Sequence, residues 1–288
     1  MRLDLHIHSR YSEDSRQDVR TILRTARARG LDGVAVTDHE TLAGSRQALA
    51  LNEDHRFYVV PGVEYATDRG HILAYFLEHE PDLSGAPPDA RGLRPWRPVV
   101  QAIHAAGGLA FLAHPFSPPK DVPPEVWESV DGVEVFNGRA GAKSPRANLE
   151  AAAAARRFGL AVSAGSDAHW PGEIGRAVWE VPGEPGRVSP AQLKELLAQG
   201  AGRGLGAAGW AVYEPLSQLV KVFRTRTYRR LPRVLAKLFL AAARDLAAPA
   251  TRRARTTQPP TTADGAAAGR RESPEAADPS DPSGSTKR

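Results

Sequence analysis

The stretch Asp4-Leu5-His6-Ile7-His8 opens this 288-residue chain and decides how its fold is interpreted. Alternating apolar and polar residues predict a strand over Arg2–His6. Side chains repeat along a strand with a period of two, so His6 and His8 are expected on the same side. Two imidazoles placed in this way either form hydrogen bonds within a core or bind a metal ion. The pair alone leaves both interpretations open.

More histidines and carboxylates occur at the ends of other short apolar runs. If those runs are strands, their polar ends meet at one rim of a barrel or parallel sheet. Imidazole nitrogens and carboxylate oxygens are donors that transition-metal ions accept. They outnumber the ligands of one tetrahedral ion, which predicts a site with more than one ion. The segments are Thr37-Asp38-His39, Gly62-Val63-Glu64, Gly70-His71-Ile72, Ala113-His114-Pro115 and Ser166-Asp167-Ala168-His169.

Strand-like and helix-like segments alternate along the body of the chain. This alternation predicts an α/β fold whose function lies at the C-terminal ends of its strands. Helices are predicted near 17–29, 41–51, 95–106, 146–158 and 189–199. The predicted strands are Arg2–His6, Gly33–Thr37, Tyr58–Val63, His71–Phe76, Leu109–Ala113, Gly132–Phe136, Ala161–Ala164 and Ala177–Val181.

The ordered motifs resemble those of the polymerase and histidinol phosphatase (PHP) family. The resemblance runs from residue 1 to about 182 and follows the family's order. It implies a distorted seven-stranded (β/α) barrel that holds two or three divalent ions, such as manganese, zinc or iron, and hydrolyses phosphoesters. The motifs are Asp4-Leu5-His6-Ile7-His8-Ser9, Thr37-Asp38-His39, Gly62-Val63-Glu64, Ala113-His114-Pro115 and Gly165-Ser166-Asp167-Ala168-His169.

The same resemblance implies a set of metal ligands. Glu64 would bridge two ions, because one carboxylate has two oxygens. Asp167 or His71 would relay a proton to the leaving group. His71 has an alternative role as a strand histidine that faces the core. The implied ligands are His6, His8, His39, Glu64, His71, His114, Asp167 and His169.

One departure from the family's pattern concerns a further ligand that usually follows the His-x-His pair. This chain has Tyr11-Ser12-Glu13-Asp14-Ser15 at that point. Asp14 is the predicted ligand and Glu13 the alternative, and either could belong to a helix N-cap instead. Asp38, next to His39, is expected to orient an imidazole rather than to touch metal.

Two arginines are candidates for gripping a phosphate group. Arg139 follows Phe136-Asn137-Gly138, and Arg176 follows Ile174-Gly175. A guanidinium binds phosphate through paired hydrogen bonds, although an ordinary solvated arginine explains each position equally well. The remaining histidines, His55, His79 and His104, are predicted to have no function.

The positive charge of the chain is concentrated in its C-terminal part. Residues 221–288 carry 15 Lys and Arg against 6 Asp and Glu, whereas residues 1–220 carry 23 against 27. We therefore expect a barrel over 1–200, a basic amphipathic helical extension over 210–250, and a disordered tail over 251–288. The glycine-rich stretch Gly200–Gly209 is predicted to be a flexible boundary.

The composition also indicates a cellular setting. The chain has no cysteine, so a reducing cytoplasm is the expected location. No signal peptide is visible, and no apolar run is long enough to span a membrane.

The predicted function is metal-dependent hydrolysis of a small phosphomonoester, such as a nucleotide or a compound like histidinol phosphate. Metal ions would lower the pKa of a bridging water and supply hydroxide for attack on phosphorus. A nuclease, or a protein that binds nucleic acid or an anionic surface through its basic extension, is the alternative. An amidohydrolase-type enzyme is disfavoured, because no lysine precedes Lys120 to supply a bridging carbamate.

Overall fold

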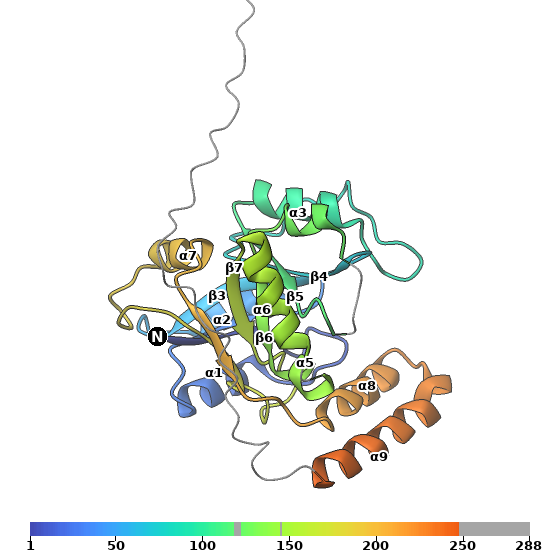
Figure 1. Ribbon diagram of the computed structural model, residues 1–288. Helices are drawn as coiled ribbons and strands as arrows, with labels where there is room; N and C mark the ends of the chain where they lie inside the picture. The colour runs from blue at the N-terminus through green and yellow to red at the C-terminus, as the bar shows by residue number, and fades with distance from the viewer. Residues whose placement is uncertain (118–121, 145, 248–288) are drawn as a thin grey trace, which may run out of the picture.

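A computed structural model describes residues 1–117, 122–144 and 146–247. Its centre is a closed sheet (Figure 1) in which each strand pairs with the next one along the chain, and β1 also pairs with β8. All eight predicted strands are present. The strands are β1 (Arg2–Ile7), β2 (Gly33–Val36), β3 (Tyr58–Thr67), β4 (Gly70–Tyr75), β5 (Leu109–Ala113), β6 (Gly132–Asn137), β7 (Ala161–Gly165), β8 (Ala177–Glu180) and β9 (Arg203–Gly206).

The predicted distorted α/β barrel is confirmed, with one difference in its strand number. The resemblance implies seven strands, whereas β1 to β8 form the ring here, because β8 pairs antiparallel with both β7 and β1. The pairs β1–β2, β2–β3, β5–β6 and β6–β7 are parallel. The strand β4 runs against both of its neighbours, β3 and β5. The distortion therefore comes from two reversed strands.

The strand β9 corrects the prediction of a flexible segment at Gly200–Gly209. It pairs antiparallel with β8, so that Ala177 lies opposite Gly206. The pairing uses backbone groups, which glycine supplies as well as any residue. A Cβ atom on Gly204 would lie 2.9 Å from Cγ2 of Val135, so the absence of a side chain permits the close approach. Glycine here serves packing, not flexibility.

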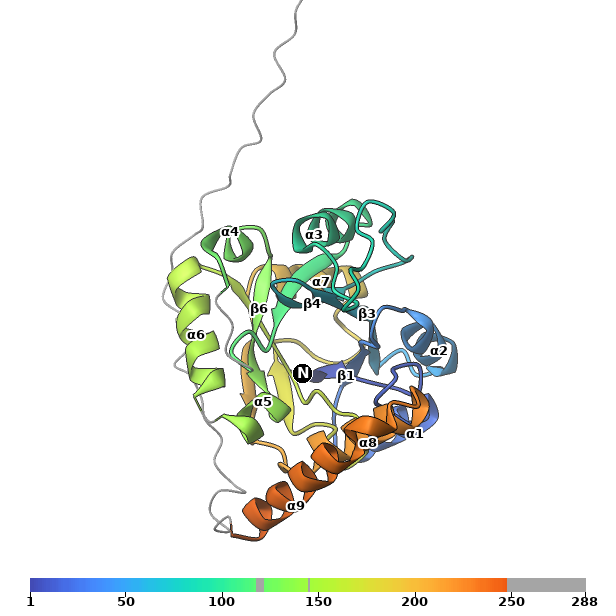
Figure 2. The ribbon, with the colours of Figure 1, turned by 90° about the vertical axis from the view of Figure 1, so that its right-hand side faces the viewer.

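Helices surround the ring on its outside, as Figure 2 shows for α1, α2, α3, α4 and α6. The helix α7 is capped by Ser189, whose side chain accepts a hydrogen bond from the backbone N–H of Gln192 in a complete capping box. The helices of the barrel are α1 (Val19–Ala28), α2 (Ala43–Leu51), α3 (Trp96–Ala105), α4 (Pro124–Trp127), α5 (Gly138–Lys143), α6 (Ala147–Phe158) and α7 (Pro190–Ala198).

A buried apolar cluster fills the interior of the ring. It joins Leu5 of β1, Tyr75 of β4 and Phe111 of β5 with Leu193 of α7. The hydroxyl of Tyr75 donates a hydrogen bond to the carbonyl of Leu5 at 3.1 Å. Because α7 closes one end of this core, the other end of the barrel is left for a functional site.

The predicted C-terminal helical extension is confirmed. It consists of α8 (Tyr213–Arg224), a short 3-10 helix η1 (Tyr228–Arg230) and α9 (Leu231–Ala247). The carboxylate of Asp245 in α9 accepts hydrogen bonds from the backbone N–H groups of Ala211 and Val212 at 3.0 and 2.9 Å, which fixes α9 beside the start of α8. The tail predicted over 251–288 lies outside the described residues. Among the helices that the structure describes, none is both long and apolar enough to cross a membrane.

Candidate metal centre

The implied ligands meet at the rim opposite α7. His6 belongs to β1, with His8 just after it, and His39, His114 and Asp167 follow the ends of β2, β5 and β7. Glu64 lies within β3, which extends to Thr67. Because β4 runs in the reverse direction, His71 at its start reaches the same rim, and Ala66 is its register partner on β3. One edge of the barrel thus collects side chains from six strands.

The carboxylate of Glu64 lies at the centre of five imidazoles. Its Oε2 atom is 3.4 Å from Nε2 of His6, 3.2 Å from Nε2 of His8 and 3.1 Å from Nδ1 of His39. Its Oε1 atom is 2.8 Å from Nδ1 of His71 and 3.1 Å from Nε2 of His114. The two oxygens thus serve different sets of rings, which is the arrangement that a bridging ligand requires.

Electrostatics keep Glu64 ionised although it is 1% exposed. Burial opposes the charge, but the nearby His71, His6 and His39 outweigh it and hold the pKa of Glu64 well below its usual range. A buried carboxylate that stays charged needs cations beside it. Here the histidines can supply that charge, and bound metal ions would supply more.

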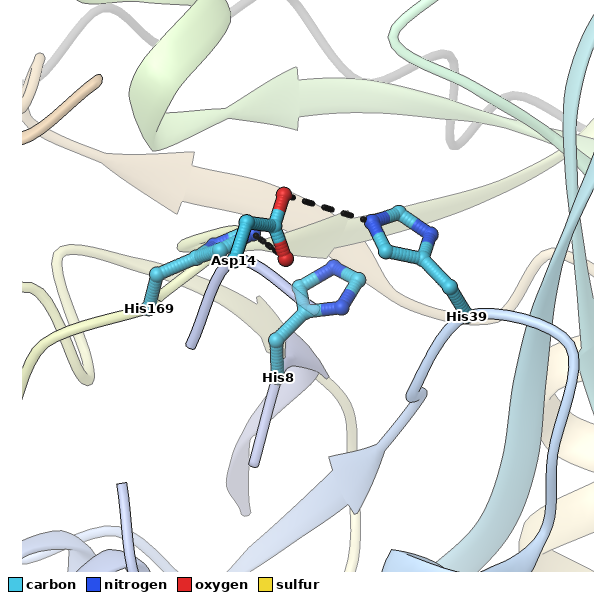
Figure 3. A group of neighbouring side chains, drawn as sticks. All are labelled: His8, Asp14, His39 and His169. Atoms are coloured by element: carbon cyan, nitrogen blue, oxygen red, sulfur yellow. Dashed lines mark ion pairs between the residues drawn. The ribbon is translucent and has the colours of Figure 1, made fainter. Parts of the chain in front are cut away.

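A second carboxylate, Asp14, gathers His8, His39 and His169 (Figure 3). Its Oδ1 atom lies 3.2 Å from Nε2 of His169, and its Oδ2 atom lies 3.6 Å from Nε2 of His39. Oδ1 is buried and makes no hydrogen bond among the described residues. Glu13 instead points outward, where its carboxylate lies 3.1 Å from Nζ of Lys221. Of the two alternatives, Asp14 is the one that lies with the histidines.

Two further groups of donors lie beside the first. His6, His8 and Asp167 form one, and His6, Glu64 and His114 form the other. Within each group, one nitrogen or oxygen from every residue lies within 4.8 Å of the others. His6 belongs to both and His8 to two of the three groups. The groups are therefore contiguous, as in a site for neighbouring ions.

The environment of His8 prepares it to donate a lone pair. Burial, together with the nearby His169 and His39, lowers the pKa of His8 to about 3, so its ring is neutral. Nδ1 lies 3.1 Å from Oγ of Ser12, which donates to Asp38 at 2.7 Å. These hydrogen bonds place the ring proton on Nδ1 and direct the lone pair of Nε2 at the cluster, where Nε2 of His6 lies 3.1 Å away and Oε2 of Glu64 lies 3.2 Å away. Asp38 thus orients the imidazole of His8 through the hydroxyl of Ser12.

Glu134 has the same role for His6 and was missed by the sequence analysis. It is 1% exposed, and its Oε1 atom lies 2.9 Å from Nδ1 of His6. Its Oε2 atom accepts hydrogen bonds from the backbone N–H of His114 at 3.0 Å and from the side chain of Asn137 at 2.9 Å. A glutamate amid the valines of β6 was the signal that could have identified it.

Backbone geometry at the rim is also specialised. His114 and Asp167 both have positive φ angles, of 30° and 58°, which residues with a side chain rarely adopt. Gly165 lies so close to β1 that a Cβ atom there would meet Cβ of His6 at 2.3 Å. The turn after β7 is thus shaped to bring Asp167 against the histidines of β1.

A cavity of about 310 Å³ lies over the donors. Its floor includes Asp14, Glu64 and Asp167. Its walls include side chains that the sequence analysis did not assign to the site, because they come from α5 and from the C-terminal helix α8. These wall residues are Lys143, Glu214, Ser217, Gln218 and Lys221.

The two candidate arginines occupy different places. Arg139 lines this cavity, but the residue is only 6% exposed, and its guanidinium is held by Glu173 through two hydrogen bonds of 2.8 Å. It also donates to Oγ of Ser217 at 2.8 Å. Arg176 lines a separate cavity of about 640 Å³ together with Arg2 and Arg29. The structure therefore brings only Arg139 to the metal ligands.

The histidines predicted to be without function lie away from the cluster. His55 and His79 are exposed. Nε2 of His104 lies 2.8 Å from the carboxylate of Asp131 on the outside of the barrel.

The donor set suits divalent transition ions. Neutral imidazoles and ionised carboxylates match the preferences of zinc, manganese and iron, and the chain has no cysteine that would favour softer ions. The buried Oδ1 atom of Asp14, which makes no hydrogen bond among the described residues, and Nε2 of His8, which faces Oε2 of Glu64 at 3.2 Å, are atoms that such an ion would contact.

Comparisons with known proteins agree with this architecture. Residues 4–120 match the PHP domain, and residues 145–201 match the PHP-associated region. An uncharacterized protein of Methanocaldococcus jannaschii is 35% identical over 149 residues, which cover 48% of this chain and 82% of that protein.

Two further matches are partial. A two-domain protein from Bacteroides vulgatus, described as containing a predicted PHP-like metal-dependent phosphoesterase, has a similar fold, with a TM-score of 0.57 at 19% identity. The match covers 71% of this chain and 64% of that one. A phosphoribosyl 1,2-cyclic phosphate 1,2-diphosphodiesterase of Eggerthella lenta is 38% identical over 81 residues, or 26% of this chain and 30% of that protein.

Proposed function

The chain belongs to the PHP family, and on that premise we propose that it is a metal-dependent phosphoesterase that hydrolyses a small phosphomonoester. One observation carries the proposal: both oxygens of Glu64 face imidazoles on the floor of a cavity that opens between α5 and α8. A bridging carboxylate with histidines on each side suits neighbouring divalent ions. Such ions would stabilise the negative charge that develops on the phosphate oxygens during hydrolysis of a phosphoester.

We assign two or three ions to the three groups of donors. Asp14 with His8, His39 and His169 would hold one, and the groups that share His6 would hold the others. When bound, the ions supply Lewis acidity and activate water for attack on phosphorus. Everything else in the reaction depends on how the chain positions the substrate and its protons.

His71 is our candidate for moving the proton. Burial lowers the pKa of His71, and its Nδ1 atom already lies 2.8 Å from Oε1 of Glu64. Its ring lines the cavity, so Nε2 is the atom available for proton exchange. Asp167 is the weaker candidate, because the nearby His6, His169 and Arg139 outweigh burial and hold its pKa well below the usual range. Asp167 therefore serves better as a ligand.

The size and charge of the cavity favour a small anionic substrate. About 310 Å³ is at the lower end of the range for small-molecule sites, which suits a nucleotide or a compound like histidinol phosphate. Lys143 and Lys221 line the walls and are about half-exposed, at 45% and 44% of their side chains. Their ammonium groups would attract the phosphate toward the floor.

A phosphodiester is the second candidate substrate. The partial match to a cyclic phosphate diesterase is the observation that favours it. That match covers only 26% of this chain, so we rank the phosphodiester second.

A metal-by-substrate screen tests both candidates. The purified chain would be stripped of metal, reconstituted separately with manganese, zinc or iron, and assayed on p-nitrophenyl phosphate and on bis-p-nitrophenyl phosphate. We expect metal-dependent turnover with preference for the monoester. Preference for the diester would replace the first candidate by the second. No turnover of either compound, or of a panel of nucleotides and sugar phosphates, with metal bound at two or more ions per chain, would overturn the proposed activity.

A further inference from the structure

The outward side of α9 is entirely apolar or basic. Phe239 is 75% exposed and Leu246 is 87% exposed, which is unusual for large apolar side chains on a folded protein. No exposed position of α9 is acidic or neutral polar. The exposed apolar residues are Pro232, Leu235, Ala236, Phe239, Leu240, Ala243, Leu246 and Ala247, and the exposed basic residues are Arg233, Lys237 and Arg244.

These residues are ordered around the helix axis. At about 100° per residue, the exposed apolar positions cover an uninterrupted arc of roughly 140°, from Leu235 to Leu240. The three basic residues follow immediately at one edge of that arc. The opposite side of α9, which includes Val234, Leu238 and Asp245, is covered by the rest of the protein. One helix thus has a packed side, an exposed apolar side and a basic edge.

The surroundings of α9 are strongly cationic. Residues 221–247 contain eight Lys and Arg and a single acidic residue, Asp245. That carboxylate is already occupied by the backbone N–H groups at the start of α8. Arg252, Arg253 and Arg255 follow α9 closely in the sequence. Both ribbon views place α9 at the outer edge of the molecule (Figures 1 and 2), and Figure 1 shows α8 between it and the barrel.

We propose that α9 docks on membrane surfaces that contain anionic lipids. A helix with a wide apolar face and a basic edge lies in the plane of the interface, with its apolar side chains among the acyl chains. Long basic side chains at the edge reach the phosphate groups of the lipids, and each one adds electrostatic attraction. Phe239, Leu235 and Leu246 would enter the bilayer surface, and Arg233, Lys237 and Arg244 would contact the headgroups.

Two features favour a lipid surface over other occupants. Residues 248–288 contain no Val, Leu, Ile, Met, Phe, Tyr or Trp, so this segment offers no large apolar side chain that could cover the exposed face of α9. Phe239 is the single aromatic residue of the arc, which otherwise consists of leucine, alanine and proline, so α9 offers no series of rings on which successive nucleic-acid bases could stack. The basic edge matches an anionic surface rather than a neutral one.

Vesicle co-sedimentation with the full-length chain tests the proposal. The vesicles would be phosphatidylcholine alone and phosphatidylcholine mixed with phosphatidylserine. We expect binding to the mixed vesicles that falls as salt concentration rises, because screening weakens attraction between charges. The double variant Phe239→Ser with Leu246→Ser should bind the mixed vesicles at least about tenfold more weakly, because it loses two large apolar side chains that would be buried in the bilayer surface.

Matched controls separate this face from the rest of the surface. Leu149→Ser removes an equally apolar side chain, 52% exposed on α6, and should leave binding unchanged. Arg233→Gln, Lys237→Gln and Arg244→Gln together should weaken binding to the mixed vesicles, whereas Arg187→Gln in an exposed turn should not. Circular dichroism and metal content of each variant verify that the fold is kept.

Three results would overturn the proposal. The first is an absence of binding to the mixed vesicles at low salt. The second is a concentration-dependent dimer in analytical ultracentrifugation that Phe239→Ser with Leu246→Ser disrupts, which would make this face an interface between two copies. The third is tighter binding to single-stranded nucleic acid than to the mixed vesicles, unaffected by that double variant. None of these readouts depends on the hydrolytic activity, so a failure here leaves the proposed function standing.

Discussion

Arg139 holds Glu173 through two parallel hydrogen bonds, both 2.8 Å long, in a buried ion pair. Glu173 also accepts hydrogen bonds from the backbone N–H groups of His169 and Trp170, at 3.0 and 3.2 Å. Arg139 donates in addition to Ser217 of α8. One guanidinium therefore joins three parts of the molecule: the helix α5, the turn that carries His169, and the C-terminal extension.

Arg139→Ala tests whether this arginine is structural or binds phosphate. The variant leaves the carboxylate of Glu173 buried without a cation, which should cost about 3–5 kcal/mol of unfolding free energy. Urea denaturation of the variant beside Arg176→Ala, which should change little, measures the effect. If Arg139→Ala were as stable as the parent chain and lost only substrate affinity, the direct phosphate contact predicted from the sequence would be the better explanation.

Glu64→Gln tests the bridging role. An amide at this position keeps the shape of the side chain but removes the charge that both oxygens present to the histidines, so metal content or turnover should fall by about two orders of magnitude. Elemental analysis and the phosphatase assay provide the measurement. His104→Ala is the control, because His104 lies outside the cluster, and the role of Glu64 is refuted by full turnover with unchanged metal content.

A chain that ends at Gly209 tests what α8 contributes. All the assigned ligands precede Trp170, so metal content should be retained. The variant loses Ser217 and Tyr213, which accept hydrogen bonds from Arg139, together with one wall of the cavity. We expect KM for the small phosphoester to rise by roughly tenfold or more and the melting temperature to fall. Unchanged kinetics would mean that α8 is not part of the substrate site.

His104 provides a prediction about pH. The hydrogen bond to Asp131, aided by the charge of that carboxylate, raises the pKa of His104, while partial burial acts in the opposite direction. A histidine with a raised pKa in the folded state stabilises the fold below its unfolded pKa, and this stabilisation is lost as pH rises through the folded pKa. His104→Gln should therefore destabilise the chain at about pH 5.5 and have little effect at about pH 9. Equal destabilisation at both pH values would show that the contact does not depend on the charge of His104.

Local sequence patterns were sufficient for much of the barrel and its rim. The alternation around His6 and the order of the motifs located every strand from β1 to β8. This was possible because the pattern of a strand and its polar end depends on a few consecutive residues. The same segments supplied Glu64 and the histidines that the structure brings together, and the family resemblance added Asp14.

What the sequence could not provide depends on contacts between distant segments. Glu134 meets His6 across 128 positions, and no local pattern pairs those two residues. Ser217 reaches Arg139 across 78 positions, so the participation of α8 in the cavity was missed. Glycines that look flexible in a sequence became the strand β9 once β8 was available as a partner.

The closure of the barrel by β1 and β8 also sets the order in which the site is assembled during synthesis. His6 and His8 leave the ribosome first, but Asp167 and His169 follow only after some 160 further residues. The carboxylate of Asp4 accepts hydrogen bonds from the backbone N–H and the hydroxyl of Ser166 across 162 positions, and these contacts join β1 to the turn after β7. A nascent chain that stops before β7 therefore has an unpaired edge on β1 and lacks the ligands Asp167 and His169. Completion of the ligand set and closure of the ring are consequently both late events in the synthesis of the polypeptide.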